Sequence, residues 1–97
     1  MNYSLLKFES MWFIYIILCD DNSLYTGSTN DLSKRFEAHI TGKGSKYTRS
    51  HKPQRIIHTE TYNTKSDALK REAQIKNWSR QEKITILNLS GVISPMK

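Results

Sequence analysis

The sequence feature that most constrains the fold is the apolar run MWFIYIILC at Met11–Cys19. The run is apolar at every position and rich in isoleucine and aromatic residues, which is typical of a strand covered on both faces. At about half the length that crosses a bilayer, it is too short for a membrane span. A turn cluster at Asp20–Ser23 follows, and extended character resumes at Leu24–Gly27. The sequence therefore predicts an antiparallel hairpin whose first strand is central in the sheet.

A helix is predicted at about Asp31–Thr41. Thr29 or Asn30 can cap its start, and Gly42 is suited to end it because glycine tolerates the left-handed conformation that follows many helices. Apolar residues at i, i+4 and i+8 should lie on the sheet, and they are Leu32, Phe36 and Ile40.

The second half of the chain predicts a loop, a strand and two helices. Residues 42–53, GKGSKYTRSHKP, are rich in glycine, serine and lysine and are expected to form the loop. A third strand is expected at Arg55–Tyr62. Each of the two helices begins with a capping box. The first helix has the box Thr64 with Asp67 and is expected to end at about Asn77. The second has the box Ser79 with Glu82 and is expected to end near Gly91.

The expected fold class is α/β (α+β), a small three-stranded antiparallel sheet flanked by helices in the order ββαβαα. The 97 residues suffice for about one domain around a modest core. Residues 11–90 are expected to form this domain, residues 1–10 an accessory N-terminal segment, and residues 91–97 a flexible C-terminal tail.

The charge balance favours a polyanionic partner. The chain has 15 Lys and Arg against 9 Asp and Glu, a net charge of +6, which suits nucleic acid or an acidic membrane surface. The one cysteine, Cys19, excludes an intrachain disulfide. No Cys/His pattern suggests a zinc site. A reducing, cytoplasmic setting is expected.

Tyr15 and Tyr25 are candidate site residues if they share one face of the hairpin. Side chains alternate across a strand, so the hairpin loop decides. A two-residue loop at Asp21–Asn22 puts the tyrosines on opposite faces, whereas a three-residue loop at Asp21–Ser23 puts them on one. We expect the three-residue loop. The alternative is that both are packing residues of a small sheet.

An arginine and a histidine edge the apolar stripe of the first helix. At about 100° per residue, Arg35 and His39 lie on the same side as Leu32. Positions i and i+4 are neighbours on a helix, so a guanidinium and an imidazole can converge on one phosphate-sized volume beside the sheet. The alternative is a solvated arginine and a half-buried histidine.

Glu72 lies inside the apolar arc of the next helix, between Ala68 and Leu69 in angle. Burial of an unpaired charge is costly, so its carboxylate must meet a cation, a metal ion or hydrogen-bond donors, or become protonated. The structural alternative is an ion pair with Lys76 or Arg35.

The loop between the first helix and the third strand carries charge of one sign. No acid occurs between Glu37 and Glu60, while a cation recurs every three residues. A cationic, glycine-containing loop with Tyr47 in it suits tracking of a phosphate backbone, with base stacking on the ring. The nucleic-acid-binding candidates are Lys43, Lys46, Tyr47, Arg49, Lys52 and Arg55.

These motifs carry a family resemblance. FIY at Phe13–Tyr15, followed after nine residues by YTG at Tyr25–Gly27, resembles the paired tripeptides of the GIY-YIG nuclease superfamily. The loop GKGSKYTR and the segment IKNWSRQEK look like those of its short, single-domain bacterial members, and a related loop is seen in structure-specific endonuclease subunits. Phe13 and Thr26 depart from the pattern without removing a functional side chain.

The remaining spacing agrees with the resemblance. Arg35 stands where the family has its helix arginine, His39 where it has His or Tyr one turn later, and Glu72 where it has its metal-binding glutamate. The resemblance implies a catalytic set of Tyr15, Tyr25, Arg35, His39 and Glu72. The late asparagine of the family corresponds to Asn77 or Asn88.

The resemblance also implies an activity. It is hydrolysis of DNA phosphodiester bonds with one divalent cation held by Glu72, Mg²⁺ with Mn²⁺ as the alternative. Tyr15 and His39 would share the task of general base, which Tyr15 can perform only if its pKa is lowered by the metal and Arg35. Structure-specific cleavage in DNA repair or recombination is the expected setting. The alternatives are a non-catalytic DNA-binding module, a subunit that needs a partner protein, and an RNA substrate.

Overall fold

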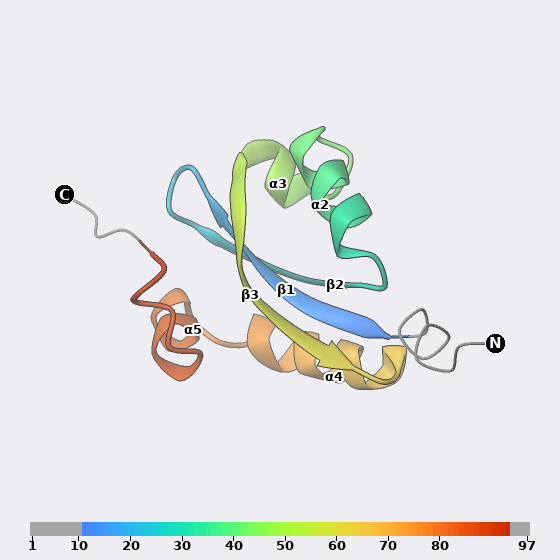
Figure 1. Ribbon diagram of the computed structural model, residues 1–97. Coiled ribbons are helices and arrows are strands. Elements are labelled where there is room, and N and C mark those ends of the chain that lie inside the picture. The colour runs from blue at the N-terminus through green and yellow to red at the C-terminus, as the bar shows by residue number, and fades with distance from the viewer. Residues whose placement is uncertain (1–10, 94–97) are drawn as a thin grey trace.

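The central element of the fold is β1 (Trp12–Cys19), the middle strand of an antiparallel sheet in the order β2-β1-β3. A computed structural model describes residues 11–93, and the accessory segment and residues 94–97 of the tail lie outside the described residues. The outer strands are β2 (Leu24–Thr29) and β3 (Pro53–Tyr62). Figure 1 shows helices on both faces of this sheet. The predicted α+β class, with the order ββαβαα, is confirmed.

The two faces of β1 build two different cores. Ile14, Ile16 and Leu18 join the larger cluster beneath α4 and α5, while Tyr15, Ile17 and Cys19 face α2. Because both faces are covered, the strand is apolar at nearly every position. The side of the sheet that carries Tyr15 is the one that positions the candidate site.

The hairpin between β1 and β2 has a loop with an odd number of residues, as predicted. Cys19 N donates to Ser23 O at 2.9 Å, and Asn22 takes the left-handed conformation with φ 70°. The loop is therefore Asp20–Asn22, one residue earlier than expected. Its parity is as expected, since Ile17 pairs with Tyr25 and so puts Tyr25 on the face of Tyr15.

Helix α2 (Leu32–Ile40) differs from expectation at both ends. Asp31, not Thr29 or Asn30, is its N-cap, and its carboxylate accepts from Lys34 N at 3.1 Å. At the other end Ile40 is 57% exposed, although it was expected to face the sheet, and His39 is fully buried instead. His39 is the last residue of α2 that contacts the sheet, through Tyr15 of β1, and the following chain covers its other ring nitrogen through Thr48. Gly42, with φ 80°, follows the helix end as expected.

The segment expected to be a loop contains the short helix α3 (Lys46–Ser50). Ser45 caps it, because its hydroxyl accepts from Thr48 N at 3.1 Å. Five residues are too few for helical periodicity to appear in the sequence. The prediction of an irregular loop there was wrong for these residues.

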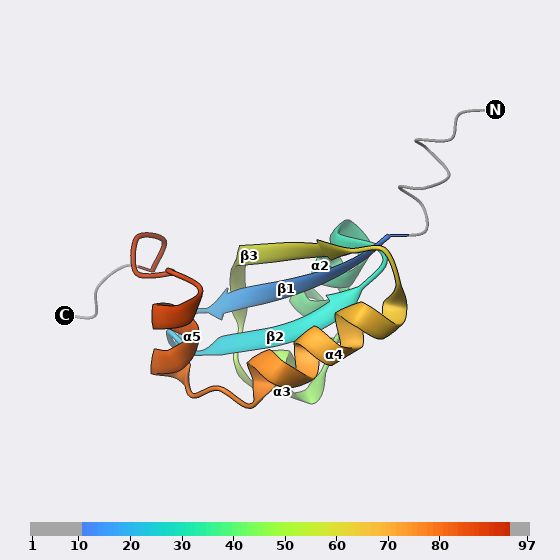
Figure 2. The ribbon, with the colours of Figure 1, turned by 90° about the horizontal axis from the view of Figure 1, so that it is seen from below.

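Two helices cover the other face, and Figure 2 shows α4 lying along β2. Helix α4 (Lys65–Lys76) is capped by Thr64 as expected. Helix α5 (Arg80–Ile86) begins with both arms of the Ser79–Glu82 capping box, and ends several residues before the predicted Gly91.

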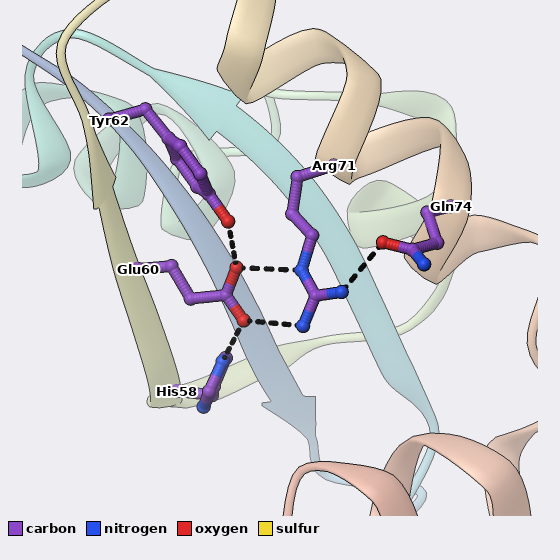
Figure 3. Close-up of polar contacts among 5 residues, drawn as sticks. All are labelled: His58, Glu60, Tyr62, Arg71 and Gln74. Atoms are coloured by element: carbon purple, nitrogen blue, oxygen red, sulfur yellow. Dashed lines mark hydrogen bonds and ion pairs between the residues drawn. The ribbon is translucent and has the colours of Figure 1, made fainter.

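Helix α4 is fixed to β3 by a polar network, shown in Figure 3. The Arg71 guanidinium donates to both carboxylate oxygens of Glu60, from Nε at 2.8 Å and from a terminal nitrogen at 3.1 Å. Tyr62 donates to the same carboxylate, and His58 lies 2.8 Å from it. This network fixes how α4 is rotated against the sheet.

Over residues 11–93, no helix combines the length and apolar character that a membrane crossing requires.

Candidate active site

The candidate site begins with three side chains held in one chain of hydrogen bonds. The Tyr15 hydroxyl lies 2.8 Å from His39 Nε2, and Arg35 Nε donates to the same hydroxyl at 3.4 Å. Tyr15 comes from β1, and the other two from adjacent turns of α2. The structure thus brings together three of the five residues implied by the two tripeptides and the helix spacing.

Tyr15 fits because the neighbouring strand has no side chain beside its ring. Tyr15 pairs with Gly27, and a Cβ at Gly27 would overlap the Tyr15 hydroxyl. The glycine of the YTG tripeptide therefore leaves the space that the phenol occupies. Since β2 is an edge strand, the hydroxyl lies close to the rim of the sheet.

Tyr25 completes the cluster on this face. Its ring centroid lies 6.3 Å from that of Tyr15 and 5.0 Å from that of His39. Tyr15 is 1% exposed, whereas Tyr25 is only partly buried. Tyr25 is thus the tyrosine more accessible to a substrate.

Burial sets the protonation of the two central groups. Burial raises the pKa of Tyr15 to about 12, against the opposing effect of Arg35. Burial also lowers the pKa of His39 to about 4, as does the positive charge of Arg35. Near neutral pH Tyr15 therefore holds its proton and His39 is neutral. To act alone as a general base, Tyr15 would need a lowered pKa. Arg35 by itself does not achieve this, because the effect of burial is larger.

The chain after α2 packs directly on these groups. The buried Thr48 hydroxyl lies 2.7 Å from His39 Nδ1, and Arg35 donates to the Gly44 carbonyl at 2.7 Å. A Cβ at Gly44 would overlap the His39 ring. Gly27 of the tripeptide and Gly44 of the loop thus each leave space for a neighbouring ring, that of Tyr15 and that of His39.

Glu72 approaches the same rim from the opposite face of the sheet. Its carboxylate accepts from Ser28 Oγ of β2 at 2.5 Å and pairs with Lys76 Nζ at 2.6 Å. The Glu72 side chain is 16% exposed and that of Lys76 49%. The Lys76 ion pair considered from the sequence is therefore present. The negative charge of Glu72 also acts on Tyr15, where it contributes to the raised pKa.

The donor set at Glu72 suits a weakly held divalent cation. Among residues 11–93, no three His, Cys, Asp or Glu side chains gather at one point, so the protein donors are the Glu72 carboxylate and the adjacent Ser28 hydroxyl. Mg²⁺ is commonly held by one or two carboxylates together with several waters and substrate phosphates. The residues present fit that pattern.

The predicted basic residues are solvent-exposed, and all except Arg55 belong to the segment around α3. Lys43, Lys46, Arg49 and Lys52 are solvent-exposed around α3. Arg55 lies on β3 and donates to the Val92 carbonyl. The Tyr47 ring stacks on His51 with centroids 4.1 Å apart and lies 5.7 Å from Tyr25. Tyr47 therefore extends the aromatic cluster of the site.

Three contributors to this arrangement were not predicted from the sequence, namely Ser28, Gly44 and Thr48. Each of them contacts a site residue on another element: Ser28 contacts Glu72, Gly44 contacts Arg35, and Thr48 contacts His39. Ser28 directly follows the second tripeptide, and Gly44 and Thr48 belong to the GKGSKYTR segment, so their proximity to motifs was the available signal. The candidate asparagines differ in place, since Asn77 is the C-cap of α4 and Asn88 has a positive φ after α5.

Comparison with known proteins identifies the class. The GIY-YIG catalytic domain family matches residues 11–85. The chain therefore belongs to the GIY-YIG family, which is a nuclease superfamily. It is 48% identical over 75 residues to the UPF0213 protein SERP0126 of Staphylococcus epidermidis, a match that covers 77% of this chain and 92% of that protein. It is 47% identical over the same length to the UPF0213 protein SAV0488 of Staphylococcus aureus.

Two solution NMR structures share the fold. The protein EF2693 of E. faecalis superposes with a TM-score of 0.58 at 34% identity, covering 90% of this chain and 93% of that one. The UPF0213 protein BH0048 of Bacillus halodurans gives a TM-score of 0.54 at 38% identity, covering 84% and 86%.

Proposed function

We propose that this chain is a metal-dependent endonuclease that hydrolyses DNA phosphodiester bonds. The observation that supports this most is the meeting at the β2 edge of two groups from opposite faces: the Tyr15–His39–Arg35 hydrogen-bond chain and the Glu72 carboxylate. Hydrolysis needs a base for water, a cation for the phosphate and help for the leaving oxygen. Membership in the GIY-YIG family supports the same chemistry.

Arg35 is proposed to grip the non-bridging oxygens of the scissile phosphate. A guanidinium has five N–H donors in a planar fork that matches phosphate geometry. Arg35 uses Nε and one terminal nitrogen within the protein, for Tyr15 and the Gly44 carbonyl. The bond to Gly44 fixes the guanidinium plane, and donors are left for the phosphate.

Tyr15 and His39 are proposed to act together as the general base. Because the raised pKa of Tyr15 keeps the phenol protonated, it can take a proton from water only while giving its own proton to His39 Nε2. Water then becomes the hydroxide that attacks phosphorus, and His39 becomes positively charged. A phosphate held by Arg35 adds negative charge beside the ring and so favours this charged form. Tyr25, the more exposed tyrosine, is proposed to position water or phosphate.

Glu72 is proposed to hold the cation, assisted by Ser28. When bound, Mg²⁺ or Mn²⁺ would offset charge on the phosphate and on the leaving oxygen. Lys76 must release the carboxylate oxygen that it occupies before that oxygen can act as a ligand. The exposed cations Lys43, Lys46, Arg49 and Lys52 are proposed to follow the phosphate backbone. Repair or recombination DNA in the cytoplasm is the proposed setting.

The proposal is tested by cleavage of labelled single-stranded, duplex, flap and four-way-junction DNA with Mg²⁺, Mn²⁺ or EDTA. We expect metal-dependent cutting by the parent chain and none by Glu72→Ala. The panel also reports which DNA shape is preferred, and matched RNA strands test the RNA alternative.

A second function is a DNA-binding module, either without turnover or active only with a partner protein. It is favoured by one observation, that Lys76 and Ser28 already satisfy the Glu72 carboxylate within the protein. Salt-sensitive DNA binding that is equal in the parent and in Glu72→Ala, with no cutting by either, would support it. Cutting that appears when a co-purifying protein is added would support the partner-dependent form.

A further inference from the structure

The two hydrogen bonds of the buried His39 ring carry a further inference. Nε2 faces the Tyr15 hydroxyl at 2.8 Å, and Nδ1 faces Thr48 Oγ1 at 2.7 Å. His39 is 0% and Thr48 2% exposed, so neither contact can be replaced by bulk water. A neutral imidazole has one N–H donor and one acceptor nitrogen. One of the two bonds must therefore use the ring proton, and the other must use the lone pair.

The bond from Arg35 indicates which nitrogen of the His39 ring carries the proton in this arrangement. Arginine can only donate, so the Tyr15 oxygen accepts from Arg35 Nε. The phenol proton then needs an acceptor inside the protein, because Tyr15 is 1% exposed. His39 Nε2 is the ring nitrogen in reach and must present its lone pair. The ring proton is thereby assigned to Nδ1.

Thr48 is arranged to accept that proton. Its hydroxyl lies 2.9 Å from Ser45 Oγ and 3.5 Å from the Ser45 carbonyl oxygen, which are acceptors for its one hydrogen. Its lone pairs are thus left for His39 Nδ1. The short helix α3 keeps Thr48 in place through the Ser45 cap.

We propose that Thr48 is a positioning residue that holds His39 in the Nδ1–H tautomer, so that Nε2 stays available for the Tyr15 proton. The segment that supplies Thr48 also supplies Gly44, whose carbonyl holds Arg35, and carries the exposed cations Lys46 and Arg49. The segment proposed to follow the DNA backbone therefore also sets the tautomer of the site. This part of the inference deepens the proposed nuclease function, whereas the tautomer itself does not depend on turnover.

The direct test is ring ¹⁵N–¹H correlation spectroscopy of the labelled full chain at neutral pH. The chain has three histidines, and His39→Gln identifies the signals of His39 by their loss. We expect a protonated Nδ1 and an unprotonated Nε2 in the parent chain and in Thr48→Ser, which keeps the hydroxyl. Thr48→Val, which removes it, should shift the ring towards the Nε2–H form. A parent chain with Nε2–H as its main form would overturn the inference without any variant, as would a folded Thr48→Val with an unchanged tautomer.

The kinetic test separates positioning from binding. On a DNA that the parent chain cuts, Thr48→Val should lower kcat by about 10-fold to 100-fold, less than the loss of a general base outright. The KM for DNA should be unchanged, because the hydroxyl faces His39 and not the surface. Thr48→Ser should cut at close to the parent rate. Equal kcat for the Val and Ser variants would contradict the proposed role. If the parent chain cuts nothing, the nuclease proposal fails while the spectra still decide the tautomer.

Discussion

Lys76 Nζ lies 2.6 Å from Glu72 Oε2, one helical turn away on α4, at the carboxylate proposed to bind the divalent cation. The ammonium group also lies 5.9 Å from the centroid of the Tyr25 ring. A lysine thus neutralises the proposed metal ligand, and it competes with any cation for the same oxygen.

Removal of this competitor should tighten metal binding. An i,i+4 ion pair is worth about 0.3 to 0.5 kcal/mol, so Lys76→Met should lower the Kd for Mn²⁺ by about twofold or more. The Kd is measured on the DNA-free protein by electron paramagnetic resonance of free Mn²⁺. Lys70→Met makes the same charge change at an exposed position of α4, and it serves as the control. Equal Kd values for the two variants would show that Lys76 does not compete.

Tyr15→Phe should leave a faint activity. Loss of a general base typically costs about 10² to 10⁴ in rate, and the phenylalanine keeps the packing of the ring. Tyr25→Phe should cost less, because its hydroxyl is proposed to position water or phosphate. The measurement is the single-turnover rate at saturating metal. A Tyr15→Phe variant as active as the parent would remove Tyr15 from the base assignment.

The Glu60 network should make stability depend on acid pH. Burial raises the pKa of Glu60, but hydrogen bonds from Arg71, His58 and Tyr62 have a larger, opposite effect. The net result is a pKa lowered from 4.5 to about 2. A pKa below its unfolded value contributes stability that is complete above about pH 4.5 and is lost as the pH falls towards about 2. The contribution of Glu60 is on the order of 2 kcal/mol.

Urea unfolding of the parent chain and Glu60→Gln measures this contribution. The difference in free energy of unfolding should be largest at neutral pH and should shrink between about pH 4.5 and pH 2. Asp21, whose pKa is also lowered to about 2 by Ser23 and His51, titrates in the same range in both proteins, so it cancels in the difference. A difference that stays constant with pH would contradict the role assigned to the Glu60 charge.

The cations around α3 should set the salt dependence of DNA binding. Each lost phosphate contact lowers the slope of log Kobs against log salt by about 0.7 to 0.9. Lys46→Ala should show this loss in fluorescence anisotropy titrations, whereas Lys70→Ala on α4 should not. Equal slopes for both variants would place the DNA path elsewhere.

The local features of the fold could be predicted from the sequence. The apolar run of β1 and the caps at Thr64 and Ser79 depend on residues close together in the chain, where periodicity and capping rules apply. The face shared by Tyr15 and Tyr25 followed from strand alternation once the parity of the hairpin loop was assumed. The prediction of the loop position was wrong by one residue because several neighbouring turn residues can take the left-handed conformation.

The features that were missed depend on contacts between distant elements. Ser28 and Glu72 are 44 residues apart, and no spacing rule connects a serine on an edge strand with a glutamate on a helix. Ile40, which was expected on the sheet, is exposed, whereas His39, which was expected at the edge of the apolar stripe, is fully buried because the chain from Gly44 to Thr48 covers it. Packing of that segment, and not helical periodicity, decided which side chain is buried.

We propose that Glu72 is the residue on which metal-dependent cleavage of DNA by this chain depends. The most direct measurement is the single-turnover cleavage rate of the preferred DNA with Mg²⁺ and with EDTA, for the parent chain, Glu72→Gln and Glu37→Gln. Glu37 is an exposed carboxylate on α2, so its variant controls for the loss of one negative charge. We predict Mg²⁺-dependent cutting by the parent and Glu37→Gln, and almost none by Glu72→Gln. Cutting by Glu72→Gln at the parent rate, or cutting that EDTA does not reduce, would contradict the claim.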